Sequence, residues 1–403
     1  MKAAVPNYLG TRHEDAAPGH RFNLYFEIWR DDWTLADKDK ANAFKRTLEV
    51  RPTSKLLAAW LERQSAQAAA LGAERVLSLT AQSIAPFATG LGNEHPLENG
   101  FAFLNPYGLP YLAGSGVKGV LRRAAQELAS GDWGDSRGWS EERTHAIRIG
   151  QETVPLSTLD VLFGREPANG DTHHARGVLS FWDVIPQLAG DRLHVEIMTP
   201  HQTHYYQHGQ SPHESGQPNP ICFLAVPPRS GFTFHVAADL LRLRRLAPEL
   251  GAEERWKALL QAAFAHAFDW LGFGAKTAVG FGAMARDREA EEREARERAE
   301  QEARAAEASR RAAMTENFLK VEDFIGECDR RLQALNGGKE RQNTGLHQRA
   351  QQLTNEARES GAWTAGEKQA LADAMTEWLP KLVERFDKAA LKKLKLAELR
   401  NQP

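Results

Sequence analysis

In the first 285 residues, apolar positions follow two different patterns along the chain, one typical of strands and one typical of helices. Short apolar runs bounded by Gly, Pro and Asn predict strands over residues 75–81, 100–104, 178–184, 193–198, 221–226 and 231–236. Apolar residues at helical spacing predict helices over residues 54–71, 117–128 and 253–271. This mixed order favours an α+β fold, a sheet with helices on one face, over a doubly wound parallel sheet.

The pattern changes abruptly near residue 286. From Arg286 to Arg311 the 26 residues include nine acidic and eight basic side chains, and no Gly or Pro. This composition predicts a long solvated helix with ion pairs between residues four apart, such as Glu294 and Arg298. We interpret it as a spacer, and a dimer seam or a disordered segment are the alternatives.

Two further helical patterns follow, the first from Glu316 to Leu335 and the second after an Asn-Gly-Gly break. Thr364 and Glu367 have the spacing of a capping box at the start of the last long helix. Pro380 interrupts its apolar pattern, so we expect a kink or a break near Leu379. The chain is therefore predicted to divide into residues 1–285, a charged helical linker over 286–314, and an α-helical region over 315–403.

Composition excludes several classes of protein. Lys and Arg total 51 against 53 Asp and Glu, so a nucleic-acid surface would have to be a local patch. Cys222 and Cys328 lie far apart, which excludes a disulfide scaffold and a CxxC metal knuckle. The polar first residues and the lack of an 18-residue apolar run predict a cytoplasmic protein without contact to a membrane.

The first glycine-rich segment places cations beside a predicted helix start. Gly114, Ser115 and Gly116 precede a helix that contains Lys118, Arg122 and Arg123. Glycines let a ligand approach the backbone, and the free amides of a helix start attract anions, so a phosphate contact is one interpretation. The other is a tight strand-to-helix turn with solvated cations.

In the second segment glycines surround a lysine and a threonine, the residues Gly272, Gly274, Lys276, Thr277, Gly280 and Gly282. A phosphate-binding P-loop requires Gly before the Lys, whereas Ala275 stands there, so nucleotide hydrolysis is not expected. A loop that lies along a nucleic-acid backbone accounts for the same residues.

Taken together, the two segments resemble the RAMP superfamily of CRISPR proteins. The run from Leu112 to Arg122 resembles one motif of that superfamily, and Gly272 to Gly282 resembles its glycine-rich loop. The run IMTPHQTHYYQ and the segment NPICFLAV are similar to the subunit of the type III-B (Cmr) effector that caps the 3′ end of the guide RNA. Two departures are Gly116, where a second Ser is usual, and Glu196, where an Asp often stands.

The resemblance covers roughly residues 75–284 and implies a ferredoxin-like (RRM-type) RAMP core with insertions. We expect residues 1–285 to form the RAMP domain, made of this core and an N-terminal extension to which the resemblance does not reach. The resemblance further implies a subunit without catalytic residues or cofactors that binds guide RNA, with target RNA as a further candidate. Its expected protein partners are other Cmr RAMP subunits and a small helical subunit. The RNA-contacting residues it implies are Gly114, Ser115, Gly116, Lys118 and Arg122 in the first motif, and all six residues of the second.

Between the motifs, a histidine-rich loop adds His201, Tyr205 and Tyr206 as candidate RNA contacts, since aromatic rings stack on unpaired bases. His201, His204, His208 and His213 also fit a zinc site or a metal-independent endoribonuclease, but the prolines and glycines among them predict a loop without fixed geometry. We expect no metal and no enzymatic activity. An RNA-free protein scaffold is the third alternative.

Two tryptophans and two aspartates complete the predictions. Trp60 and Trp270 each lie on an apolar helical face, and we expect both in the core. Asp132 and Asp135 lie in the turn GDWGDSRGW, where we expect solvated carboxylates.

Overall fold

The computed structural model describes residues 1–36, 40–45, 47–97, 99–167, 172–199, 205, 208–209, 211, 220–335, 338–343 and 345–400. The chain forms two compact units, Met1–Arg293 and Glu294–Pro403. Each unit has its own hydrophobic core. No helix in the described part of the chain is long and apolar enough to cross a membrane.

A four-stranded antiparallel sheet forms the centre of the first unit. β1 (Val76–Ser83) pairs with β11 (Gly231–Ala238) on one side and with the short edge strand β12 (Met284–Arg286) on the other. β8 (Leu179–Phe181) pairs with β11, so the order is β12-β1-β11-β8. The chain is thus a mixed helix and sheet protein, as its patterns predict.

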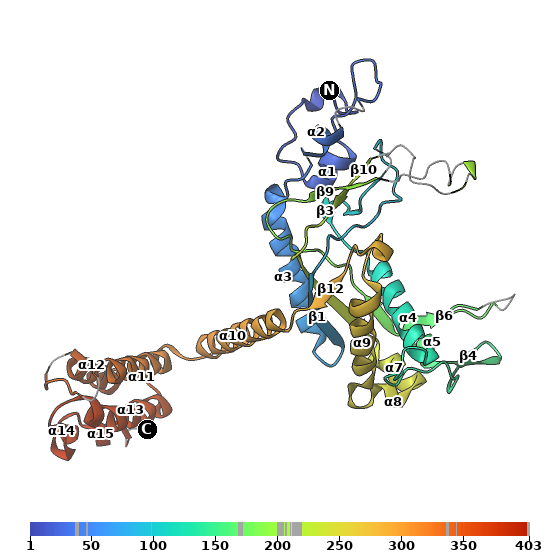
Figure 1. The fold of residues 1–403 in the computed structure, drawn as a ribbon. Coiled ribbons are helices and arrows are strands. Elements are labelled where there is room, and N and C mark those ends of the chain that lie inside the picture. Colours follow the sequence, from blue (N-terminus) through green and yellow to red (C-terminus); the bar gives the residue numbers. More distant parts are fainter. Residues whose placement is uncertain are drawn as a thin grey trace. The chain divides into compact units, whose positions relative to one another are not determined.

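Two helices follow strands of this sheet and pack on each other, as Figure 1 shows. α4 (Gly114–Ser130) lies between β1 and β8 in the chain, and α9 (Arg255–His266) lies between β11 and β12. The Phe234 ring on β11 meets the Phe264 ring on α9 with centroids 5.3 Å apart, so apolar packing joins sheet and helix. α3 (Ser54–Leu71) contacts β1 and lies on the other side of the sheet from α9 in Figure 1.

The other elements of the first unit are two-stranded sheets and short helices. The two-stranded sheets are β2 (Phe103–Leu104) with β3 (Leu109–Pro110), β4 (His145–Ile149) with β5 (Glu152–Leu156), β6 (Gly164–Arg165) with β7 (Ala175–Arg176), and β9 (His194–Met198) with β10 (Ile221–Ala225). The short helices are η1 (Asn7–Leu9), α1 (Pro18–Asn23), α2 (Lys40–Lys45), η3 (Arg51–Thr53), α5 (Thr158–Phe163), α7 (Leu240–Leu246), α8 (Pro248–Gly251), η4 (Ala252–Glu254), η5 (Ala267–Leu271) and η6 (Thr277–Val279).

The predicted elements are found with some changes of length. The bounds of α3 are those predicted, whereas the strand predicted over residues 178–184 shortens to β8 and that over 100–104 to β2. The helix predicted over residues 253–271 is α9 followed by η5, a five-residue π-helical turn. The prediction that Trp270 is buried was wrong, since 65% of it is exposed. A π turn advances fewer degrees per residue than an α-helix, so the apolar face expected from α-helical spacing no longer includes residue 270.

One glutamate links the sheet to the charged helix α10 (Arg288–Ala312). Glu291 accepts a hydrogen bond from the Thr80 backbone N–H at 2.9 Å and pairs with the Arg286 guanidinium at 2.9 Å. Its carboxylate therefore satisfies a strand N–H at the point where β12 has ended. The long helix predicted here is present. An ion pair of the predicted spacing joins Arg304 and Glu300 at 3.7 Å. In the pair named from the sequence, the Arg298 Nε atom donates to the Glu294 backbone oxygen at 3.2 Å.

The second unit contains a helical core. Its helices are α11 (Glu316–Leu335), α12 (Gly345–Glu359), α13 (Ala365–Leu382), α14 (Lys388–Lys393) and α15 (Leu396–Arg400). Phe324, Leu371 and Met375 are fully buried in it. The predicted capping box is confirmed, because Thr364 accepts from the Glu367 N–H and Glu367 accepts from the Thr364 N–H.

Of the two outcomes predicted near Leu379, the break is contradicted and the kink stays a prediction. α13 continues through Pro380 and ends at Leu382. Proline lacks the N–H that would bond the carbonyl four residues earlier, here that of Thr376, so α13 loses one hydrogen bond in the turn before Pro380 and continues for two more residues. The Lys339 ammonium donates to the Pro380 carbonyl at 2.7 Å, which satisfies an acceptor of the last turn.

Burial predicts very different reactivities for the two thiols. Cys328 lies in the core of the second unit, and desolvation raises the pKa of its thiol to about 12. Because the thiolate is the nucleophile, we expect Cys328 in the folded chain to react with iodoacetamide at pH 8 at least about 100-fold more slowly than the half-buried Cys222. Peptide mass spectrometry over a time course measures both rates, and the unfolded chain in urea is the control. Equal rates in the folded chain would contradict this burial.

Candidate nucleic-acid interface

Both glycine-rich segments lie at the same end of the central sheet. The loop of residues 272–283 precedes β12, whose first residue Met284 pairs with Ser83, the last residue of β1. The start of α4 lies against the residues that follow β8, because the Gly114 N–H donates to the Asp183 carboxylate at 2.7 Å. Since β1 and β8 are both antiparallel to β11, their carboxyl ends point the same way.

Backbone hydrogen bonds connect the two segments across this end. The Ala275 N–H donates to Ala88 at 2.7 Å, the Ala102 N–H donates to Thr89 at 3.1 Å, and the Tyr111 N–H donates to Ala102 at 3.4 Å. Three residues later α4 begins. In Figure 1 the orange segment that leads to β12 lies beside the first turn of α4. The structure therefore brings together residues that are about 150 positions apart in the sequence.

The glycine-rich loop is held at its base and projects at its tip. The Gly282 N–H donates to the Pro86 carbonyl at 2.8 Å, and the Phe273 N–H donates to the Gly282 carbonyl at 2.9 Å. Phe273 is fully buried, whereas Val279 at the tip is 71% exposed. The tip residues, η6 and Gly280, therefore project to solvent from a loop base that is held by hydrogen bonds and by the buried Phe273 side chain.

The four glycines of this loop have two different roles. At Gly282, with φ +70°, a Cβ would collide with the Phe273 carbonyl oxygen, and at Gly274, with φ +92°, it would lie 2.6 Å from the Phe87 ring. Gly272, with φ +67°, is buried beside Gly282. Gly280, with φ +93°, has open space around it. Gly272, Gly274 and Gly282 therefore allow the base to pack, and only Gly280 leaves room for a ligand.

Lys276 lies between the loop tip and the β9–β10 hairpin. Its backbone adopts the left-handed conformation, with φ 60°. Its ammonium lies 3.2 Å from the Met198 sulfur and 5.4 Å from the centroid of the Phe223 ring. Phe223 is buried, in agreement with the expectation that it packs in the core. These contacts orient a cation without neutralising it, and Thr277 follows it at the first position of η6.

The start of α4 differs from the predicted turn. Gly114, Ser115 and Gly116 do not precede the helix but form its first turn. The Gly114 N–H is taken by Asp183, and a Cβ at Gly114 would collide with the Phe181 backbone. The structure therefore gives Gly114 a role in packing and at the helix start, and its N–H is not available to a phosphate. Ser115 is exposed and Gly116 is partly exposed, so both remain accessible.

Three cations occupy this end of the sheet without an ion pair within the described residues: Lys118 on α4, Arg229 before β11 and Lys276 in the loop. Arg122, in contrast, pairs with Glu166 at 3.1 Å and its side chain is only 22% exposed. A phosphate would have to compete with that carboxylate for Arg122.

Arg229 was missed by the sequence analysis. It is exposed, has φ 66°, and its N–H donates to the Ser83 carbonyl at the end of β1 at 2.7 Å. A signal was available, because the segment Pro-Pro-Arg-Ser-Gly separates two predicted strands and marks a turn that carries a cation. Only the strand order shows that this turn reaches the same end as the glycine-rich loop.

Most of the histidine-rich loop lies outside the described residues. His201, His204, Tyr206 and His213 are among the residues that lie there. Tyr205 is 44% exposed. The loop connects β9 to β10, and β9 ends at Met198, the residue that Lys276 contacts. Among the residues described, no group of three His, Cys, Asp or Glu side chains converges on a possible metal position.

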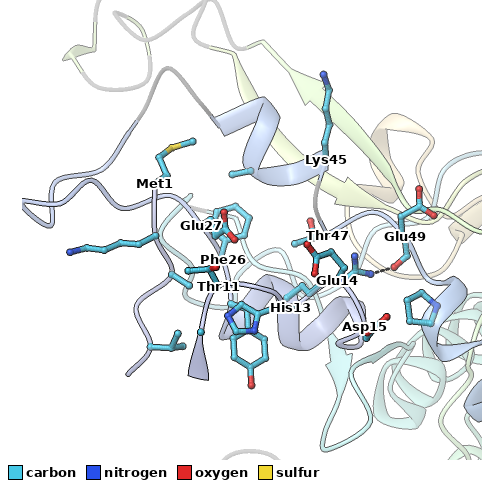
Figure 2. A pocket seen from close by; sticks show the side chains of 18 of the residues that line it. Met1, Thr11, His13, Glu14, Asp15, Phe26, Glu27, Lys45, Thr47 and Glu49 are labelled. Atoms are coloured by element: carbon cyan, nitrogen blue, oxygen red, sulfur yellow. Dashed lines mark hydrogen bonds between the residues drawn. The ribbon is translucent and has the colours of Figure 1, made fainter. Parts of the chain in front are cut away.

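A separate cavity of about 970 Å³ lies in the N-terminal segment and is shown in Figure 2. Acidic and basic side chains line it together, including Glu14, Glu49 and Arg21. The Arg21 guanidinium donates to the Glu49 carbonyl, and burial lowers its pKa against the opposing effect of the Glu49 and Glu14 carboxylates. This internal pairing leaves no excess of positive charge for a nucleic acid.

Comparison with known proteins gives one family. The family model of the RAMP superfamily matches residues 80–285, slightly more than half of the chain. A curated relative, the CRISPR system Cmr subunit Cmr6 of Pyrococcus furiosus, is 30% identical over 235 residues. That match covers 48% of this chain and 63% of the relative, so the chain spans just under two thirds of the relative's length.

Two solved structures show a weaker likeness to this chain. A cryo-EM structure of the type III-B Cmr-beta complex bound to cognate target RNA matches with a TM-score of 0.39 and 15% identity, over 62% of this chain and 70% of that chain. The crystal structure of Cmr6 from Pyrococcus furiosus matches with a TM-score of 0.27 and 24% identity, over 53% of this chain and 98% of that chain.

Proposed function

Because the chain belongs to the RAMP superfamily, we propose that it is a non-catalytic RNA-binding subunit of a type III-B CRISPR effector complex. In this proposal it contacts the guide RNA backbone and neighbouring subunits during RNA-guided antiviral defence. The name of the curated relative, a Cmr subunit, supports the assignment to such a complex.

One observation carries the RNA-binding proposal: the two glycine-rich segments lie at the same end of the central sheet. Lys118, Arg229 and Lys276 lie at one end of the sheet, together with a loop whose tip offers open backbone at Gly280. Positive charge combined with close backbone approach suits the phosphates of a single strand, which carry no sequence information. Ser115 and Thr277 would add hydrogen bonds to phosphate oxygens. The Gly116 N–H donates to the Ala113 carbonyl at 2.8 Å, so Gly116 would contribute close approach rather than a hydrogen bond.

We further infer that residues 76–286 form a ferredoxin-like core. The chain order β1–α4–β8–β11–α9–β12 is a βαββαβ arrangement, and the antiparallel order β12-β1-β11-β8 supports it. In this view the RAMP domain comprises residues 1–285, α10 belongs to the linker over 286–314, and residues 315–403 form a helical region. Guide RNA, target RNA, other Cmr RAMP subunits and a small helical subunit are its proposed partners.

A salt titration tests the RNA-binding proposal. The full chain, alone and in a reconstituted complex, is titrated with a labelled single-stranded RNA of mixed sequence and with oligo-uridine. Three phosphate contacts predict that the logarithm of affinity falls with the logarithm of salt concentration with a slope of about −2, and that both RNAs bind alike. Binding that is absent or insensitive to salt in both settings would contradict the proposal.

A cleavage assay tests the absence of catalysis. Labelled CRISPR repeat RNA is incubated with the wild-type chain and with a His201→Ala, His204→Ala double variant. We expect intact RNA in both reactions, because a subunit that only holds RNA needs no general base. Cleavage by the wild type that the double variant loses would instead establish a metal-independent endoribonuclease.

A further inference from the structure

Two exposed tryptophans contact each other beyond the end of α4. Trp133 follows α4 in the chain and is 45% exposed, and Trp270 in η5 is 65% exposed. Their ring centroids lie 5.1 Å apart with an angle of 58° between the ring planes. Leaving two such large apolar rings in water is costly, so an exposed pair of this kind indicates a binding surface.

Polar side chains support one ring of the pair, that of Trp133. His266 lies beneath Trp133, with ring centroids 4.9 Å apart in an edge-to-face contact. The His266 Nε2 atom lies 2.8 Å from the Glu127 carboxylate, and both side chains are nearly buried. Arg123 Nε donates to the same carboxylate at 2.7 Å. Burial raises the pKa of Glu127, but hydrogen bonds from His266 and Arg123 outweigh this and lower it overall.

The segments that carry the two rings are acidic. Asp132 and Asp135 flank Trp133, Asp269 precedes Trp270, and all three are exposed. Arg137 is the one basic residue in these two segments, Gly131–Gly138 and η5. This charge repels phosphate and attracts cations. A nucleic-acid strand is therefore a poor occupant of this surface, in contrast to the glycine-rich loop.

Other tryptophans of the chain already have a lysine ammonium placed over their indole rings. The Lys2 ammonium lies 3.9 Å from the ring centroid of Trp33, which is 54% exposed, and Lys381 lies 4.8 Å from that of Trp378. In the part of the chain that the structure describes, no lysine or arginine covers Trp133 or Trp270 in this way. The position that a cation would take over these rings is open to another molecule.

We propose that Trp133 and Trp270 form a docking site for an arginine or lysine side chain of a partner protein. A cation held over an indole face, in segments that carry three exposed carboxylates, gains both cation–π and Coulombic attraction. Tryptophan and arginine are also the residues that most often dominate the free energy of protein interfaces. This site is distinct from the proposed RNA contacts and does not depend on them.

The test uses a labelled alanine-based helical peptide with several arginines as the probe, and fluorescence anisotropy with the full chain as the measurement. We expect Trp270→Ala to weaken binding of this peptide at least 10-fold and Trp270→Tyr to restore most of it. Leu241→Ala, a change at a residue that is 77% exposed elsewhere, should leave binding unchanged. The same peptide with glutamates in place of the arginines should not bind.

Two outcomes would overturn the docking site. One is that the arginine peptide binds wild type and Trp270→Ala equally, or neither of them. The other is that Trp270→Ala abolishes binding of oligo-uridine and leaves peptide binding unaffected, which would make the pair a base-stacking platform. Circular dichroism of each variant separates loss of binding from loss of fold. Intact RNA affinity in Trp270→Ala keeps this result separate from the proposed function.

Discussion

A Gly282→Ala variant is expected to lose about 3–5 kcal/mol of unfolding free energy in its first unit. Gly282 has φ +70°, and an added Cβ would collide with the Phe273 carbonyl. Phe273 cannot retreat, because its ring is buried between Phe234 and Phe268, with ring centroids 5.0 and 5.7 Å away. Urea denaturation followed by near-UV circular dichroism measures the loss.

Gly280→Ala is the matched control for this variant. Gly280 has φ +93° but nothing within 4 Å of an added Cβ. Backbone strain is then the remaining cost of the substitution, so we expect this variant to lose about 1–2 kcal/mol of unfolding free energy. If both variants were equally stable, the loop base would not be packed as the structure shows it.

Removing Lys118, Arg229 and Lys276, which form no ion pair with any residue that the structure describes, is expected to have the largest effect on RNA affinity. The triple variant Lys118→Ala, Arg229→Ala, Lys276→Ala should bind single-stranded RNA about 100-fold more weakly, since each lost phosphate contact costs about 1 kcal/mol. The slope of the salt dependence should move toward zero by about 2. Single substitutions of Lys118 and Lys276 should each cost about 1 kcal/mol.

α7 provides a control with the same change in charge. Arg242, Arg244 and Arg245 follow the carboxyl end of β11, which is the opposite end of the sheet from the glycine-rich loop. Replacing all three with Ala should change RNA affinity by less than about threefold at moderate salt, because exposed charges beyond a Debye length are screened. Equal losses in both triple variants would show that net charge, rather than this interface, governs binding.

Several elements were predictable because their signals are local. The bounds of α3 and α11, the charged helix and the Thr364 capping box all follow from residues within a few positions of one another. The helical repeat and the capping hydrogen bonds need no distant partner. The resemblance to the RAMP superfamily was equally visible, because both motifs are contiguous runs.

Other features depended on partners far along the chain. Asp183 takes the Gly114 amide, and Glu166 pairs with Arg122, each from more than 40 residues away. No spacing in the sequence marks either pairing. Arg229 escaped prediction for the same reason, since a cation in a turn acquires a role only when the strand order brings that turn beside another loop.

The amino-acid sequence by itself determined which segments are helical, where glycines allow positive φ, and which family the chain resembles, since these depend on local residue types. The tertiary structure alone decided which glycines pack and which stay open, that Glu166 pairs with Arg122, and that Trp133 and Trp270 meet in solvent. These properties arise where the sheet and the η5 turn bring distant residues within a few ångströms, and no local pattern encodes such distances.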